Sequence, residues 1–383
     1  MKQSVKFKVL VGFVLAAMLA LFMVACSSGS GSASSTSDSA SSESVSASSE
    51  SASAASESAS AASDSASASA AAGGFEVVDV TGKVFTLEAP VNKVIGTHNP
   101  TLNAVVVIGG GGQHLAGFGN KEKADGLYSK VIEGWDGLTS IGKGKEVNFE
   151  TVATLGADMA LVPERQASMA EEYAKVGLDT FVALPNEESF DTIKESLTRI
   201  GTLFGKSDRA AEINAEFDKL VSEASAACEG AAEKPSVLFM GDDLYEVASS
   251  SMIQTYIIDA VGATNAVQGD YKPGEFASVD AETIAGFNPD VIWIPNYASY
   301  SVDDVLNDPK LAEVSAVKNG AVYMFPSKLE PWDYPTASTC LGVCWAANSL
   351  HPDQYSKEDL MKAADEFYTL VYGKTFTAEE LGI

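Results

Sequence analysis

Histidine, cysteine and basic side chains are scarce in this sequence. The 383 residues include 3 histidines and 4 cysteines, and 25 lysines and arginines stand against 52 acidic residues, which gives a net charge of −27. Nucleic-acid binding requires basic patches, so this charge argues against a nucleic-acid partner. It also weakly disfavours strongly anionic ligands. The cysteines and histidines lack the spacing of a zinc site, and we expect Cys228, Cys340 and Cys344 to be small buried residues.

Catalytic motifs are absent as well. The sequence contains no G-x-S-x-G, no P-loop and no H-E-x-x-H, and three widely separated histidines offer little for acid–base chemistry. The glycines at 109–112 follow an expected helix instead of opening one, which disfavours a dinucleotide site. We therefore predict that the protein is not an enzyme and has neither a cofactor nor a resident metal.

The N-terminus has the pattern of a secretory signal. Three lysines among the first eight residues precede an apolar run at 9–25, and Cys26 follows it. A cysteine at this position resembles the lipobox of bacterial lipoproteins. This predicts that Cys26 is lipidated and holds the protein on the extracytoplasmic side of the cell membrane. The methionine at position 23 is less usual there than leucine, and an uncleaved membrane anchor is the alternative.

The segment that follows is a low-complexity tether. Residues 27–74 are nearly all serine and alanine, with scattered acidic residues and no aromatic residue. Such a segment cannot bury enough apolar surface to offset the entropy of the chain, so we expect it to be disordered. The rest of the chain is long enough for two domains of ordinary size.

A pattern of helix and strand occurs twice in that remaining part. Residues 148–163 read NFETVATLGADMALVP, and residues 280–295 read DAETIAGFNPDVIWIP. Each copy predicts a short amphipathic helix, a turn and an apolar strand that ends at proline. Strands without polar alternation are typical of a parallel sheet that is covered on both faces. The repeat therefore predicts two α/β lobes of one design, with a ligand site between them at the carboxyl ends of the strands.

One long helix is predicted between the lobes. Residues 207–231 contain no proline and only a late glycine, and their apolar residues recur at helical spacing from an expected N-cap at Ser207. The predicted fold is thus α/β, with two Rossmann-like lobes that have central parallel sheets and are joined by this helix. The predicted segments are a signal at 1–25, the lipidated cysteine and tether at 26–74, the first lobe at 75–205, the inter-lobe helix at 206–232 and the second lobe at 233–383. A continuous helix resists bending, so we expect only slight closure around a ligand.

Three features together resemble a known family. They are the expected hairpin at 75–87 followed by Lys-Val-Ile-Gly at 93–96, the paired E-T-[VI]-A-x-x-x-x-D signature, and the closing segment FYTLVYGKTFT at 367–377. From about residue 75 onward the chain resembles the class III (cluster A) solute-binding lipoproteins of ABC importers, whose lobes are joined by one long helix. The resemblance implies a monomer that captures a metal chelate, such as a ferric siderophore, haem or cobalamin. It also implies delivery of that chelate to an ABC permease dimer with its ATPase.

The loops that leave the strand ends carry the candidate ligand-binding residues, because rigid strands position such loops. The candidates are His98, Asn99, Glu164 and Arg165 in the first lobe, and Asp242, Asp243, Tyr245, Asn296, Tyr297, Trp332, Asp333 and Tyr334 in the second. Arg165 is able to bind a carboxylate or phosphate through two hydrogen bonds. Trp332 suits a large planar or apolar ligand, although a simple turn before a helix at Pro335 is the alternative. For His98, ligand contact, metal ligation and local capping all stay open.

Glu150 and Glu282 occupy matching positions in the two copies of the repeat. The resemblance implies that such a pair forms salt bridges with the two permease subunits, whereas stabilisation of the helix dipole is the alternative role.

The identity of the ligand stays open in the sequence. Aromatic residues with His98 fit haem or a corrinoid, and Arg165 with polar loops fits a hydroxamate siderophore or an oxyanion such as molybdate or tungstate. A chelatase-like enzyme and a surface lipoprotein without a transport role are the alternatives from other functional classes.

Overall fold

The computed structural model describes residues 74–231, 233–269 and 271–383. Residues 74–383 belong to one compact unit. The predicted signal at 1–25, the lipidation site Cys26 and all of the predicted tether except Gly74 lie outside the described residues. Within the described ranges, no helix combines the length and the hydropathy of a membrane span.

The first lobe is built on a parallel sheet. β3 (Val94–Ile95), β6 (Met159–Pro163) and β7 (Asp179–Leu184) pair side by side in the order β3-β6-β7. All of β6 is buried, as the apolar run in the sequence predicts for a strand covered on both faces. The other elements are the hairpin β1 (Phe75–Val78) and β2 (Val84–Leu87), the short pair β4 (Gly142–Lys143) and β5 (Glu146–Val147), and the helices α1 (Asn99–Gly109), α2 (Asp125–Val131), α3 (Phe149–Val152), α4 (Ala170–Lys175) and α5 (Phe190–Leu203), with 3-10 turns η1 (Lys121–Lys123), η2 (Trp135–Gly137) and η3 (Glu164–Met169).

The second lobe has a parallel sheet of its own. β10 (Thr264–Asn265), β8 (Ser236–Phe239), β12 (Val291–Pro295) and β13 (Val322–Phe325) pair in the order β10-β8-β12-β13, all parallel. The other elements are the antiparallel pair β9 (Glu246–Ala248) and β11 (Phe276–Ser278), and the helices α7 (Ile253–Ala260), α8 (Ala281–Phe287), α9 (Val302–Leu306), α10 (Ser315–Lys318), α11 (Thr339–Leu350), α12 (Lys357–Tyr372) and α13 (Ala378–Leu381). The predicted α/β fold with two parallel sheets is confirmed.

The two copies of the repeat form equivalent elements in the two lobes. Each supplies a helix and a central strand, α3 with β6 and α8 with β12. The duplicated aspartates also match: Asp158 accepts a hydrogen bond from the backbone N–H of Lys93, just before β3, and Asp290 accepts one from the backbone N–H of Ser236, where β8 begins. In both lobes this carboxylate therefore fastens the central strand to the start of its neighbour.

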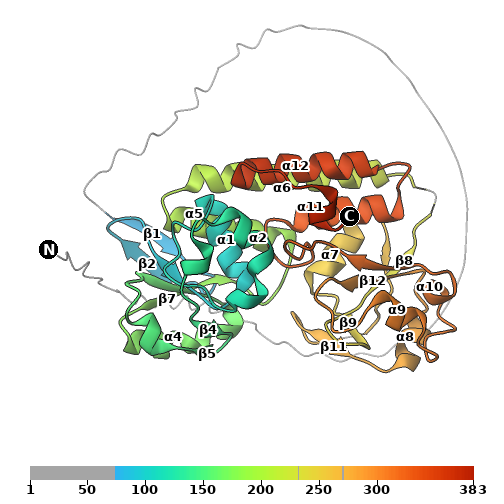
Figure 1. Cartoon of the computed structure of the whole chain (residues 1–383), viewed down its shortest axis with the longest axis horizontal. Coiled ribbons are helices and arrows are strands. Elements are labelled where there is room, and N and C mark those ends of the chain that lie inside the picture. Colours follow the sequence, from blue (N-terminus) through green and yellow to red (C-terminus); the bar gives the residue numbers. More distant parts are fainter. Residues whose placement is uncertain (1–73, 232, 270) are drawn as a thin grey trace, which may run out of the picture. The chain divides into compact units, whose positions relative to one another are not determined.

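A single helix, α6 (Ser207–Cys228), joins the lobes, and Figure 1 shows it running along both of them beside α12. Its buried residues include Ile213, Phe217 and Leu220, and the helix packs against α5 of the first lobe and against α11 and α12 of the second. The prediction of Ser207 as its N-cap is wrong. The helical hydrogen bonds already begin at the carbonyl of Lys206, which accepts from the backbone of Ala210, so Ser207 is the first helical residue.

Residues 115–118 form only isolated bridges, Leu115 to Val94 and Phe118 to Ser140, because the two ends of this segment pair with different parts of the chain. The three cysteines of the described chain are free and buried, as expected.

A buried hydrogen-bond network also crosses between the lobes. It consists of Asn103, Glu330, Trp332 and Tyr368. The Asn103 amide of α1 donates to Glu330 at 2.9 Å, and the Tyr368 hydroxyl of α12 donates to the other oxygen of Glu330 at 3.0 Å. The Trp332 ring nitrogen donates to Tyr368 at 2.9 Å. We call these four residues the inter-lobe network, since they fix the loop after β13 to the first lobe.

Candidate functional site

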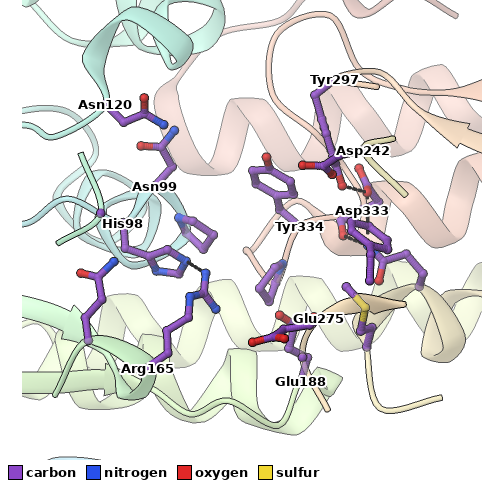
Figure 2. A pocket seen from close by; sticks show the side chains of 18 of the residues that line it. His98, Asn99, Asn120, Arg165, Glu188, Asp242, Glu275, Tyr297, Asp333 and Tyr334 are labelled. Carbon is purple, nitrogen blue, oxygen red and sulfur yellow. Dashed lines mark hydrogen bonds between the residues drawn. The ribbon is translucent and has the colours of Figure 1, made fainter. Parts of the chain in front are cut away.

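One cavity of about 580 Å³ lies between the lobes and is lined by both of them. Most of its polar side chains come from loops at the carboxyl ends of six strands: β3, β6 and β7 in the first lobe, and β8, β12 and β13 in the second. Parallel α/β sheets place their ligands at this edge. We call this cavity the cleft, and Figure 2 shows its lining side chains.

Most of the predicted ligand-binding residues lie together in the cleft. Those that line it are His98, Asn99, Arg165, Asp242, Tyr297, Asp333 and Tyr334. Asn296 lines a smaller adjoining cavity of about 210 Å³, which shares Asn99, Asp242, Tyr297 and Tyr334 with the cleft. Residues that were selected because they follow strands therefore lie together, although some are more than 200 positions apart in the chain.

Four other predicted residues line neither cavity, each for a local reason. Glu164 accepts a hydrogen bond from the backbone of Asn186, and Asp243 accepts one from the Ser299 hydroxyl. The Tyr245 hydroxyl donates to Asp308. Trp332 belongs to the inter-lobe network and has 0% exposure, so it packs inside the protein instead of lining the cleft as the sequence predicts.

Arg165 and His98 form a coupled pair on the first lobe. A guanidinium nitrogen of Arg165 lies 2.6 Å from Nε2 of His98, and Nδ1 of His98 lies 2.9 Å from the Thr101 hydroxyl. Because a guanidinium only donates, Nε2 must accept, which assigns the ring hydrogen to Nδ1. Burial, and then the charge of Arg165, hold the pKa of His98 well below its usual value, so the ring stays neutral. In this arrangement His98 positions Arg165, and both of its ring nitrogens are already engaged.

The opposite wall is acidic. The Asp333 carboxylate is buried and accepts from the Tyr297 hydroxyl at 2.6 Å and from the Gln254 amide at 3.2 Å, both through Oδ2. Burial raises the pKa of Asp333 to about 6. Desolvation raises the pKa of Asp242, and the negative charges of its neighbours Glu246 and Asp243 add to the effect. This wall therefore concentrates negative charge that the protein itself leaves largely uncompensated.

Glu188 spans the two lobes, and the sequence prediction missed it. It follows β7 in the first lobe, and its Oε2 accepts from the backbone of Ile253 at 3.1 Å. Ile253 is the first residue of α7 in the second lobe, whose own N-cap residue Met252 makes no side-chain bond. Burial raises the pKa of Glu188 to about 7. Its place in the loop after β7 follows the same strand-end rule that selected Arg165.

The remaining lining residues that the prediction missed are mostly uncharged. They include Gln166, Asn120, Met252, Gln254 and Phe276, together with the acidic Glu246 and Glu275. Several come from loops that do not end a central strand, so strand order alone gives no reason to select them. No cluster of three or more histidine, cysteine or acidic side chains placed to hold a metal ion occurs in the described part of the chain.

The sequence profile of the periplasmic binding protein family matches residues 101–329. The chain belongs to this family. The molybdate-binding protein MolA of Haemophilus influenzae is 23% identical over 322 residues, which cover 78% of this chain and 91% of MolA. The petrobactin-binding protein YclQ of Bacillus subtilis is 23% identical over 197 residues, which cover 50% of this chain and 62% of YclQ.

Solved structures show the same fold. MolA bound to molybdate superimposes on this binding protein with a TM-score of 0.70 at 20% identity, covering 79% of this chain and 99% of MolA. A periplasmic solute binding protein from Veillonella parvula gives a TM-score of 0.68 at 21% identity, covering 80% of this chain and 95% of the other. The cleft thus lies within an architecture shared with other solute-binding proteins.

Glu150 and Glu282 lie at matching places on this binding protein. Each is exposed and stands in the first turn of its helix, α3 or α8. In Figure 1, α8 and the β4–β5 pair that leads into α3 lie on the side of the molecule away from α6. Contact of these glutamates with a permease stays a prediction.

We expect Glu188 to make the stability of the protein depend on pH. In the unfolded chain a glutamate loses its proton near its ordinary pKa of 4.5, whereas in the folded protein Glu188 takes up a proton as the pH falls through about 7. The folded state therefore binds more protons between these values. We expect this one group to raise the free energy of unfolding as the pH falls from about 8 to about 6, by up to about 1.4 kcal/mol per pH unit. Buried Glu330, whose pKa is also raised to about 7, acts in the same direction.

Urea unfolding of the unmodified protein and of Glu188→Gln, measured across this pH range, tests the expectation. Glutamine keeps an oxygen that accepts from Ile253 but cannot ionise, so the stability of the variant should vary less with pH. His98 has a lowered pKa and opposes the trend below about pH 6.5, but it is present in both proteins and cancels in their difference. Identical pH profiles would contradict a titrating Glu188.

Proposed function

We propose that this protein is an extracytoplasmic solute-binding protein that captures a metal chelate of the siderophore, haem or corrinoid class and delivers it to an ABC permease. The observation that carries the proposal is the cleft of about 580 Å³ on which loops from both lobes converge. Sites for small organic ligands and cofactors commonly enclose roughly 300–1,000 Å³. The cleft therefore has the capacity for a chelate that touches both lobes at once.

An oxyanion such as molybdate or tungstate is the second candidate. The likeness to MolA favours it, and so does Arg165, which is held in the cleft by neutral His98. Two observations weigh against it. A small oxyanion is only a few times the size of a water molecule (~30 Å³) and leaves most of the cleft empty. A dianion also faces Asp242 and Asp333 across the cavity.

We also propose how the protein is held and how it docks. Lipidation of Cys26 anchors it to the membrane, and the serine-rich and alanine-rich segment gives it reach. Glu150 and Glu282, exposed at matching positions in the two lobes, each meet a basic residue on one subunit of the permease. Single surface ion pairs are weak, but two matched pairs fix register and orientation.

Thermal unfolding of the purified protein with a panel of ligands tests the proposed function. The panel contains haem, cobalamin, a ferric hydroxamate, a ferric catecholate, molybdate and tungstate. A chelate present at 100 times its dissociation constant should stabilise the protein by about 2.7 kcal/mol. Stabilisation by molybdate or tungstate alone would favour the second candidate, and stabilisation by none of the panel would contradict the proposal.

A further inference from the structure

The two walls of the cleft differ in charge. The first lobe contributes Arg165, beside neutral His98, and the inter-lobe carboxylate of Glu188. The second lobe contributes four carboxylates, those of Asp242, Glu246, Glu275 and Asp333. Figure 2 shows Arg165 and His98 on one side of the cavity and Asp242 and Asp333 on the other.

The protein provides few counter-charges for this acidic wall. Glu275 pairs with Lys272 at 2.6 Å. Among the described residues, no lysine, arginine or histidine forms a salt bridge with Asp242, Glu246 or Asp333. Lys123, on the adjoining cavity, acts on Asp242 only at longer range. A cation that enters the cleft therefore finds three carboxylates that are not already paired.

Asp333 also has an oxygen with no hydrogen-bond donor. Both of its neutral donors, Tyr297 and Gln254, bond to Oδ2, whereas Oδ1 is buried without a partner. The side chain has 0% exposure and lines the cleft. Gln254 adds a second buried oxygen without a donor, Oε1. Buried acceptors of this kind are rare in folded proteins unless a ligand, ion or water completes them.

The buried oxygens without donors and the carboxylates without counter-charges both favour a ligand group that is positively charged and donates hydrogen bonds. An unpaired buried carboxylate is costly, and a positively charged donor satisfies both its charge and its missing hydrogen bond. A trianionic catecholate or the carboxylates of haem bring more negative charge to the same wall and meet repulsion there. Arg165, on the opposite wall, remains free to bind an acceptor or anionic part of the same molecule.

We infer that the cargo carries a protonated amine, which lies against Asp242, Glu246 and Asp333 while the metal-binding part of the molecule faces Arg165. The class of ligand is thus an amine-bearing chelate that is cationic or zwitterionic, such as a linear ferric trihydroxamate that ends in a primary amine. This inference rests on the proposed function, because it assigns the kind of chelate that the same cleft takes.

The deciding experiment compares two ferric trihydroxamates that differ only in acetylation of the terminal amine. Acetylation removes the positive charge and leaves the metal centre unchanged. Isothermal titration of the purified full chain should give an affinity for the free amine that is higher by about tenfold or more. Haem and molybdate are titrated in parallel as anionic ligands.

The double variant Asp242→Asn/Glu246→Gln should remove the preference, so that both trihydroxamates bind with similar affinity. Glu358→Gln/Asp365→Asn is the matched control. It removes the same two negative charges from exposed positions on α12, no residue of which lines the cleft. The control should keep the full preference for the free amine, which separates local recognition from the effect of net charge.

The outcomes distinguish this inference from the proposed function. Equal or tighter binding of the acetylated chelate would overturn the amine inference and leave the chelate-binding function standing. Binding of haem alone would do the same. Binding of molybdate alone, or of none of these ligands, would overturn both. An equal loss of preference in the control variant would also contradict the assignment to Asp242 and Glu246.

Discussion

Replacing both Glu150 and Glu282 by arginine is expected to abolish uptake of the cargo while leaving its affinity unchanged. Both side chains are exposed and lie on surface helices outside the cleft, so the change spares the ligand site. If the permease presents basic residues to them, the variant places like charges opposite one another at two points, which costs on the order of several kcal/mol. Uptake of a radiolabelled ferric chelate by cells that depend on this protein measures the first effect, and isothermal titration measures the second.

The chain offers a closely matched control. Glu358 and Glu379 are also exposed and also occupy the second position of a helix, in α12 and α13. Their replacement by arginine makes the same change in net charge and in the field at a helix N-terminus. Uptake should survive in this control. Equal loss of uptake in both variants, or weaker ligand binding in Glu150→Arg/Glu282→Arg, would contradict a docking role for the pair.

Trp332→Ala is expected to destabilise the protein by about 3–5 kcal/mol, the usual cost of removing a large side chain from a core. The ring is fully buried, and its nitrogen donates to Tyr368, which in turn donates to Glu330. The substitution therefore opens a cavity and breaks the inter-lobe network at one residue. Urea unfolding followed by circular dichroism measures the free energy of unfolding.

Two comparison variants separate a structural role from a binding role. Trp332→Phe keeps most of the volume and loses only the hydrogen bond, so we expect a cost nearer 1 kcal/mol from that bond. Tyr334→Ala removes a ring that lines the cleft and should weaken ligand binding more than it lowers stability. If Trp332→Ala left stability intact and weakened binding alone, the tryptophan would be a ligand contact after all.

Periodic segments were well predicted from the sequence. The long helix predicted from residue 207 onward appears as α6, because its apolar residues recur at helical spacing. The apolar strands of the two repeat copies were equally clear. In such segments, local pattern and tertiary packing favour the same structure.

The predicted site was less complete, and Trp332 shows why. It follows a strand and stands beside Asp333 and Tyr334, which do line the cleft. No feature of the local sequence distinguishes Trp332 from Asp333 and Tyr334. Its hydrogen-bond partner, Tyr368, lies 36 residues further along the chain, in a different helix. Tyr245 is similar, because its partner Asp308 is 63 residues away.

Glu188 was missed for a different reason. It lies in the loop after β7, whereas the predicted candidates of the first lobe lie in the loops after β3 and β6. Its main contact is a backbone N–H of the second lobe, which no pattern in the sequence of the first lobe reports. Contacts between lobes depend on how the two sheets are placed, and that placement becomes visible only in three dimensions.

The inter-lobe network should affect how fast the cargo is imported. Because α6 and the Asn103–Glu330 bond fasten the lobes at separate points, the spacing of Glu150 and Glu282 should be nearly the same with and without cargo. A transporter that contacts these two side chains then meets nearly the same surface on loaded and unloaded binding protein. It therefore has little basis for rejecting the unloaded form. We expect unloaded copies to occupy the importer as competitors, so that import slows when this protein outnumbers its cargo.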